Sequence, residues 1–243
     1  MIIKNKKMTS RTTKTILFAG LIFTLMVSVS GMNVAEAAQC SNPHCYATGY
    51  EGVTLSGARF TTFVTDLVPV SSCSDTPTVT HWVYFSNGDK LEDGFTSGLV
   101  AGSCYTTEKS YYATDLSVGG YTEYNAGSLT IGSINIFEIS DTDKNKYWLI
   151  KRNTSQLANI LMSANYGILT EAGIEGNRNN PSTTFIPTTH IYNFQKYAGS
   201  PSSWLSAQPT WDDDDTYKYY LSSCTNTHFH VRTGNSLTCS GSH

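Results

Sequence analysis

The segment from His81 to Gly98 constrains the fold of this chain more than any other stretch. It places Asn87-Gly88 between two runs in which large and polar residues alternate. Asn-Gly is the strongest short signal of a β-hairpin, because both residues tolerate the positive φ angles of a two-residue type I′ turn. The segment therefore predicts two antiparallel strands joined by a tight turn.

A two-residue loop also predicts which side chains share each face of this hairpin. Val83 then lies opposite Glu92, and His81 lies opposite Gly94. Because strand side chains alternate, one face carries His81, Lys90 and Glu92. The other face is mostly apolar and consists of Trp82, Tyr84, Leu91, Asp93 and Phe95.

The remainder of the chain is rich in Ser, Thr, Gly, Asn and Tyr and has no long helical periodicity. We count about ten short strands with turn residues every 8–12 positions, a spacing typical of β-sandwiches and jelly rolls. The predicted fold is therefore all-β, a two-sheet antiparallel β-sandwich in one domain.

The first 37 residues have the pattern of an export signal. A basic start precedes the apolar run Ile16–Val29, and Ala35-Glu36-Ala37 has the A-x-A form of a cleavage site. The alternative is a single anchoring helix, but the apolar run is short for a membrane span. We expect a secreted, extracellular protein whose domain covers 38–243, with 38–57 and 200–243 as disulfide-tied peripheral segments and no membrane contact after cleavage.

Removing this segment takes away five basic residues and Glu36, so the net charge changes from −3 to −7. Nucleic-acid binding needs a basic surface. The negative net charge therefore argues against a nucleic-acid partner. The sequence does not indicate the oligomeric state.

All six cysteines lie after the predicted cleavage site. An even number in an exported chain predicts disulfides rather than metal ligands or nucleophiles. Six cysteines allow 15 pairings, and among these we favour pairing in chain order. The pairs are then Cys40 with Cys45, Cys73 with Cys104, and Cys224 with Cys239.

Glu92 has a possible partner in the strand-like run from Tyr166 to Gly176. Alternation in this run assigns Ile168, Ala172 and Ile174 to the core, and Gly167, Glu171, Gly173 and Glu175 to the other face. Glycines beside a carboxylate leave room for a ligand. Two carboxylates on one face could perform acid–base chemistry if the pKa of one were raised. The alternative is that both are solvated residues of an outer sheet face.

Three segments resemble the eqolisins, the glutamic peptidases. Leu91-Glu92-Asp93-Gly94-Phe95 is similar to their Leu-Gln-Thr-Gly-Val segment. The run from Tyr121 to Tyr124 is similar to their Tyr-Glu-Trp-Tyr strand. Thr170–Glu175 is similar to their Ala-Glu-Trp-Ile-Val-Glu strand. The resemblance covers about Trp82 to Tyr197 and implies a concanavalin A-like (lectin/glucanase) sandwich. It aligns Glu171 with the family's catalytic Glu and Glu92 with its Gln. A carboxyl group donates a hydrogen bond to an oxyanion only when it is protonated.

Metal-binding signals are weak in this sequence. The Asp141–Lys146 loop begins like a calcium loop but lacks its glycine and its final glutamate, so we predict a polar hairpin loop. The Asp212–Asp215 run could bind a cation but is better explained as a solvated loop. His228 and His230 share a strand face without an evident third ligand. We therefore predict neither a metal site nor a cofactor.

Two functions of different classes follow from these patterns, and a third is structural. Our first prediction is an extracellular module that binds a glycan or another polymer on its concave sheet, because tyrosine rows can stack on sugar rings. The alternative is a hydrolase that uses Glu92 and Glu171 on a glycan or, at acid pH, on peptides. A structural surface protein is the second alternative. The candidate ligand-binding residues are His81, Tyr112, Tyr121, Glu123 and Glu175.

Overall fold

The computed structural model describes residues 44–69, 73, 76–177, 184–198, 203–213 and 219–234. The chain divides into two compact units, Met1–Glu36 and Ala37–His243. Every described residue belongs to the second unit, and the predicted export signal lies outside the described part. The described residues form strands, turns and loops without a helix. Accordingly, no described helix has the length and apolar character needed to cross a bilayer.

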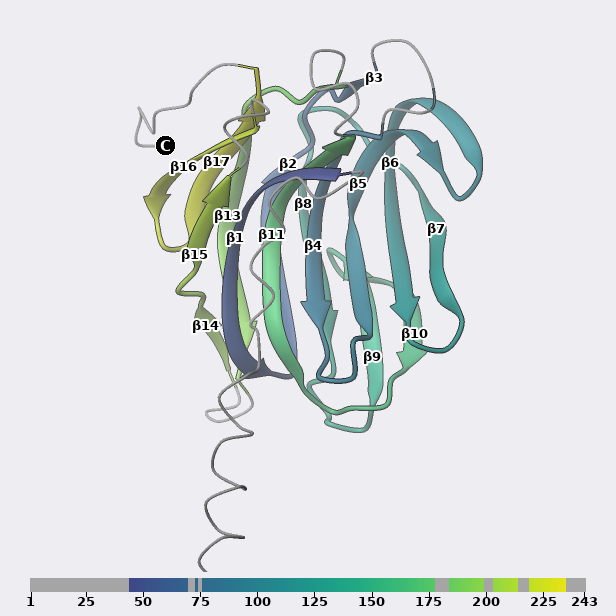
Figure 1. Cartoon of the computed structure of the whole chain (residues 1–243), viewed down its shortest axis with the longest axis vertical. Coiled ribbons are helices and arrows are strands. Elements are labelled where there is room, and N and C mark those ends of the chain that lie inside the picture. Colours follow the sequence, from purple (N-terminus) through teal and green to yellow (C-terminus); the bar gives the residue numbers. More distant parts are fainter. Residues whose placement is uncertain are drawn as a thin grey trace, which may run out of the picture. The chain divides into compact units, whose positions relative to one another are not determined.

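The predicted two-sheet antiparallel β-sandwich is confirmed (Figure 1). The first sheet has seven strands in the order β15-β1-β11-β4-β5-β6-β7. Its strands are β1 (His44–Leu55), β4 (Thr78–Tyr84), β5 (Lys90–Val100), β6 (Ser103–Leu116), β7 (Gly120–Ser128), β11 (Gly167–Asn177) and β15 (Thr210–Asp213). Every strand pair in it is antiparallel.

The second sheet has eight strands, seven of them in the order β10-β9-β8-β2-β13-β17-β16, with β14 paired to β13. They are β2 (Gly57–Phe63), β8 (Ile134–Ser140), β9 (Tyr147–Arg152), β10 (Ser155–Leu161), β13 (Thr189–Tyr197), β14 (Trp204–Ser206), β16 (Tyr219–Thr225) and β17 (His228–Thr233). Two short strands, β3 (Val68–Pro69) and β12 (Thr184–Phe185), pair separately.

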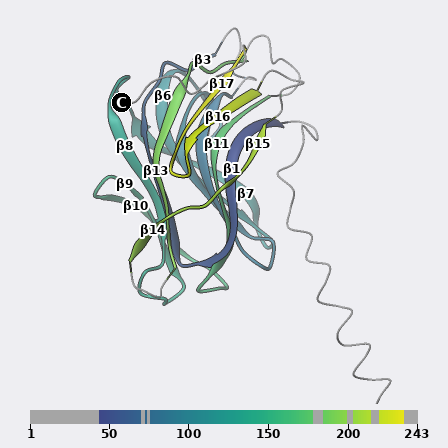
Figure 2. The ribbon, with the colours of Figure 1, turned by 90° about the vertical axis from the view of Figure 1, so that its left-hand side faces the viewer.

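The core lies between the two sheets, which appear as two facing layers in Figure 2. One cluster of buried residues includes Phe60, Phe95 and Phe137, and a second is centred on Trp148 and Val83. Both clusters draw on alternate residues of strands from the two sheets, as the period of two in a strand requires. Each sheet therefore has an inner face in the core and an outer face, and the candidate chemistry is on the outer ones.

The hairpin at Asn87-Gly88 exists, but its predicted register is wrong by one residue. Its loop has three residues, because the Phe85 N–H donates to the Asp89 carbonyl at 2.9 Å. Within the loop only Gly88 has a positive φ, of 87°, as in a type I turn followed by a bulge. The Asn87 side chain instead accepts a hydrogen bond from the Asp89 N–H.

This extra loop residue changes the faces of the hairpin. Trp82 lies opposite Glu92, and His81 lies opposite Asp93. The inner face therefore carries His81, Val83, Leu91, Asp93 and Phe95, whereas the outer face carries Trp82, Tyr84, Lys90 and Glu92. A one-residue slip reverses one strand relative to the other, which is why His81 and Glu92 lie on opposite faces.

The predicted Cys73–Cys104 disulfide is confirmed. It connects the segment before β4 to the start of β6, so it closes a covalent loop around the β4–β5 hairpin. Cys45 and Cys224 are also disulfide-bonded. The two remaining cysteines, Cys40 and Cys239, lie outside the described residues, so the rest of the predicted pairing stays a prediction.

Gly94→Ala is expected to destabilise the fold strongly. A Cβ at this position of β5 would lie 2.1 Å from the Val79 carbonyl oxygen and 2.9 Å from Thr80 Cα. These are backbone atoms of the paired strand, so they cannot move aside cheaply. We expect the free energy of unfolding to fall by about 3 kcal/mol or more in urea denaturation.

Gly52→Ala on β1 is the matched control for this measurement. A Cβ there meets no atom within 4 Å, and we expect a change within about 0.5 kcal/mol. Equal effects of the two substitutions would contradict the proposed close approach of β4 and β5.

Candidate functional site

Glu171, Trp82 and Glu92 form a row across three neighbouring strands of the seven-stranded sheet. Trp82 on β4 pairs with Glu171 on β11 and with Glu92 on β5. Paired residues point to the same face, so all three side chains lie on the outer face of this sheet. With strands about 4.8 Å apart, the backbones of the two glutamates are separated by roughly 10 Å. The two carboxyl groups therefore share one face, with a single strand between them.

The Glu171 carboxylate is held by two hydroxyl donors. Thr48 donates to Oε1 at 2.6 Å, and Tyr84 donates to Oε2 at 2.9 Å. Only 6% of the residue is exposed, and this burial raises the pKa of Glu171 above its usual value, although both hydroxyl groups oppose the shift. The donors favour the ionised form and fix both oxygens, which is suitable for a group that accepts a proton.

Glu92 has a more strongly altered acidity. Its Oε1 accepts hydrogen bonds from Tyr111 at 2.5 Å and from Thr80 at 3.2 Å, while the Lys90 ammonium is 3.9 Å from Oε2. Burial raises the pKa of Glu92 to about 7, and the nearby Glu175 carboxylate adds to this, against the opposing effects of Lys90 and the two hydroxyl groups. Glu92 is therefore protonated over most of the acid range and can donate a hydrogen bond there.

A pocket of about 200 Å³ opens beside Glu92 on this outer face. Its charged lining includes Glu123, Glu175 and His44, and His44 Nδ1 is 2.7 Å from Glu175 Oε1. The hydrogen bond to Glu175 raises the pKa of His44, although partial burial opposes this. The other lining residues are Thr76, Thr78, Lys90, Glu92, Leu99, Tyr111 and Tyr121. We call this cavity the glutamate pocket.

Three of the five predicted ligand-binding residues line the glutamate pocket, namely Tyr121, Glu123 and Glu175. Their roles there stay predictions. The sequence reasoning missed five residues that contact the two glutamates or their surroundings: Thr48, Tyr84, Thr80, Tyr111 and His44. Alternation along β4 groups Thr80 with Trp82, but only the observed register places this face beside Glu92. Thr48 and His44 come from β1, which is brought beside β11 only by the tertiary fold.

His81 and Tyr112 do not lie on this face. His81 is fully buried in the core, where its Nδ1 is 2.9 Å from the Asp93 carboxylate and its Nε2 is 3.2 Å from the Thr170 hydroxyl. Tyr112 is paired with Asp93 on the same inner face and stacks on Tyr124. The wrong hairpin register explains the misplacement of His81, since it assigned His81 to the face of Glu92.

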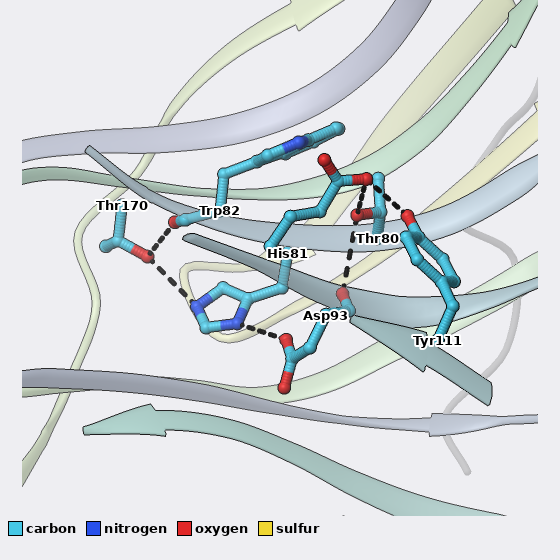
Figure 3. A network of polar contacts seen from close by, with 7 residues as sticks. Thr80, His81, Trp82, Asp93, Tyr111 and Thr170 are labelled. Atoms are coloured by element: carbon cyan, nitrogen blue, oxygen red, sulfur yellow. Dashed lines mark hydrogen bonds and ion pairs between the residues drawn. The ribbon is translucent and has the colours of Figure 1, made fainter. Parts of the chain in front are cut away.

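The buried network around His81 connects the strands beneath the two glutamates (Figure 3). Thr170 on β11 contacts His81 and also donates to the Trp82 carbonyl at 3.1 Å, and Asp93 on β5 completes the chain. Burial raises the pKa of Asp93, and the hydrogen bond with His81 opposes this shift. The network thus fixes β11, β4 and β5 relative to one another, and these are the strands that carry Glu171, Trp82 and Glu92.

Two expectations for β11 are wrong. A Cβ at Gly173 would lie 2.2 Å from the Ala47 carbonyl oxygen, so this glycine permits close approach of β1 rather than room for a ligand. The approach places Thr48 beside Glu171. Ile168, which alternation assigned to the core, is 43% exposed, because it lies near the start of β11, opposite the irregularity between Gly52 and Leu55.

The acidic loops behave differently from one another. The Asp141–Lys146 segment is a hairpin loop between β8 and β9, as predicted, and the Asp141 carboxylate accepts hydrogen bonds from the N–H groups of Asn145 and Lys146. In the Asp212–Asp215 run, the first two residues belong to β15 and the last two lie outside the described residues. The prediction of a solvated loop is therefore wrong for Asp212 and Asp213, which pair with β1, and stays a prediction for Asp214 and Asp215.

Comparison with known proteins identifies the fold and leaves the family open. No family model matches the chain, and no curated protein matches it. Two solved structures of scytalido-glutamic peptidase with transition-state analogues match at TM-scores of 0.52 and 0.53, with 11% and 12% identity. The first match covers 80% of this chain and 99% of the peptidase chain, and the second covers 78% and 98%, respectively. A structure of SCP-B, a member of the eqolisin family in complex with the tripeptide Ala-Ile-His, has a TM-score of 0.49 and 12% identity over 80% of this chain and 99% of its own. At these identities the likeness to the two scytalido-glutamic peptidase structures establishes a shared β-sandwich fold.

Proposed function

We propose that this protein is a hydrolase that cleaves peptide bonds at acid pH with Glu171 and Glu92. The observation that carries the proposal is the pair itself, in which two buried carboxyl groups flank Trp82 on one sheet face. Glu92 has its pKa raised to about 7. Two carboxyl groups in different environments are the usual requirement for separate acid and base roles.

In the proposed reaction, Glu171 acts as the general base. Its carboxylate removes a proton from a water molecule as the water oxygen forms a bond to the peptide carbonyl carbon. Protonated Glu92 donates a hydrogen bond to the carbonyl oxygen, on which negative charge develops. The carbon–nitrogen bond then breaks, Glu171 returns its proton to the leaving amine, and Glu92 keeps its own.

This assignment accounts for the presence of Glu92 where the eqolisin resemblance has Gln. An amide donates a hydrogen bond at any pH, whereas a carboxyl group donates only below its pKa. Because the pKa of Glu92 is about 7, the substitution preserves the donor in acid and removes it above neutrality. The fold shared with the two scytalido-glutamic peptidase structures, which hold transition-state analogues, supports the same reaction class.

A glycan-binding module is the second candidate. Tyr121 favours it, because this residue is 54% exposed at the glutamate pocket and offers a ring for sugar stacking. Trp82 and Tyr111, two further aromatic residues beside the glutamates, are buried, and Tyr84 is partly buried, which leaves less ring area for a polymer. Secretion is part of both proposals, and the Cys73–Cys104 disulfide supports an oxidising compartment.

The test is turnover by the purified protein of a denatured protein substrate and of mixed polysaccharides between pH 3 and 9. We expect new amino termini from the protein substrate in acid, with a rate that decreases as the pH rises through about 7, the pKa of Glu92. Polysaccharide binding without turnover of either substrate would contradict the proposal and favour the glycan-binding module.

A further inference from the structure

Three histidines meet on the outer face of the eight-stranded sheet, which is not the sheet that carries the glutamate pocket. His190 on β13 is paired with His230 on β17, and His228 precedes His230 by two residues on the same strand. The two strands are neighbours in Figure 1. The alternate residues Ile191, Phe229 and Val231 belong to the core. The three imidazoles therefore point to the outer side.

Their spacing suits a single metal ion. One ring nitrogen from each histidine can be chosen so that all three lie within 4.8 Å of one another. The Nε2 atoms of His228 and His230 are 3.2 Å apart. Two ligands of a tetrahedral zinc ion with Zn–N distances of 2.0–2.1 Å are separated by about 3.4 Å. Two of the ligand positions are thus already at the required distance.

The third ring lies close enough to complete the set. The ring centroid of His190 is 3.9 Å from that of His230. On the other side, the Tyr192 ring stacks on His228 with centroids 4.4 Å apart, and Phe63 packs edge-on against Tyr192. Paired strands and packed rings limit the movement of the imidazoles, so small rotations of the side chains suffice to direct three nitrogens to one point.

We propose that His190, His228 and His230 bind a Zn²⁺ ion. Neutral imidazole is a preferred zinc ligand, and three protein ligands leave the fourth tetrahedral position for water or an external ligand. The ion would connect β13 to β17 across the sheet. The site is independent of the proposed hydrolase chemistry, because Glu92 and Glu171 belong to the other sheet.

The test is zinc titration of the protein purified without a histidine tag and stripped with a chelator. In competition with a chromophoric chelator, we expect one ion per chain. Co²⁺ in place of Zn²⁺ should give the visible absorption of a tetrahedral site. At a hundredfold excess over Kd, zinc should raise the melting temperature by about 5 °C or more.

His190→Ala and His228→Asn are each expected to weaken zinc affinity by about 100-fold or more and to remove the cobalt spectrum, since even outer-shell changes cost 10- to 100-fold. His228 is only partly buried, so its variant serves if His190→Ala fails to fold. His44→Gln, at the glutamate pocket, is the matched control and should bind zinc as the wild type does.

Two results would overturn the proposal. One is the absence of stoichiometric zinc binding by the folded wild-type protein. The other is binding that survives His190→Ala and His228→Asn but is lost in His44→Gln, which would place the ion in the glutamate pocket. Neither result depends on hydrolytic activity, so the proposal can fail while the proposed hydrolase function stands.

Discussion

Glu171→Gln is expected to reduce the hydrolysis of peptide bonds by a factor of about 10²–10⁴ in kcat, the usual contribution of a general base. The amide has nearly the same shape as the carboxyl group, but it cannot accept a proton from water. Thr48 and Tyr84, which hold the two carboxylate oxygens, remain in place. The loss should therefore appear in kcat wherever Glu171 is ionised in the wild type, with a smaller effect on KM.

The measurement is initial-rate kinetics on a denatured protein substrate at several pH values. Asp143→Asn makes the same chemical change on the exposed loop between β8 and β9 and should keep the wild-type rate. Circular dichroism and the melting temperature check that both variants are folded. A Glu171→Gln variant with the wild-type rate would remove this residue from the mechanism and leave the proposed function without a base.

Glu92→Gln is expected to extend activity to higher pH. In the wild type the donor to the oxyanion is a carboxyl group with a pKa of about 7, so the rate falls as this proton is lost. An amide does not titrate, and its N–H donates at any pH. The decrease near pH 7 should therefore disappear or move upward by more than one pH unit, while the rate in acid changes much less.

Glu92→Ala provides the contrast, because it removes the donor altogether. Below pH 7 we expect a decrease of about 10²–10³-fold, as for other oxyanion-stabilising groups. The difference should shrink above pH 7, where the wild-type carboxyl group has itself lost the donated proton. If the hydrolysis rate of Glu92→Gln still decreases near pH 7 as it does in the wild type, another group titrates there. The role assigned to Glu92 would then be wrong.

Glu92→Gln should also change how the free energy of unfolding depends on pH. The pKa of Glu92 rises from 4.5 to about 7 on folding, so between these values the folded state binds more protons than the unfolded state. The free energy of unfolding therefore decreases as the pH rises through this window. Glu92→Gln removes that decrease, so urea denaturation should show it gaining stability relative to wild type from pH 4.5 to pH 7, by an amount on the order of 3 kcal/mol.

Much of this molecule could be predicted from local patterns in the sequence. Alternation in the run around Glu171 placed this residue and Glu175 on the outer face and Ala172 and Ile174 in the core, because the side-chain period of a strand is fixed by backbone geometry. Turn residues at short intervals predicted the all-β sandwich. Cysteine order predicted the Cys73–Cys104 disulfide.

The register of the β4–β5 hairpin depended on one loop residue. Asn87-Gly88 is compatible with a two-residue and a three-residue loop, and the alternatives differ in whether Asn87 takes a positive φ or binds Asp89 through its side chain. The prediction assumed the two-residue loop with a positive φ at Asn87. Leu91 and Phe95, the apolar residues of the following strand, are buried in the core. The three-residue loop gives the register in which they share the inner face with Val83.

Contacts between distant segments were decided by the tertiary structure alone. The β4–β11 pairing brings Trp82 beside Glu171, and the β1–β11 pairing brings in Thr48, across long separations in the chain. His190 joins His228 and His230 in the same way, through the β13–β17 pairing. Local alternation determines which face a side chain occupies, but strand order determines its neighbours. The sequence by itself therefore determined the fold class and the outward position of Glu171, and only the packed sheets decided what surrounds it.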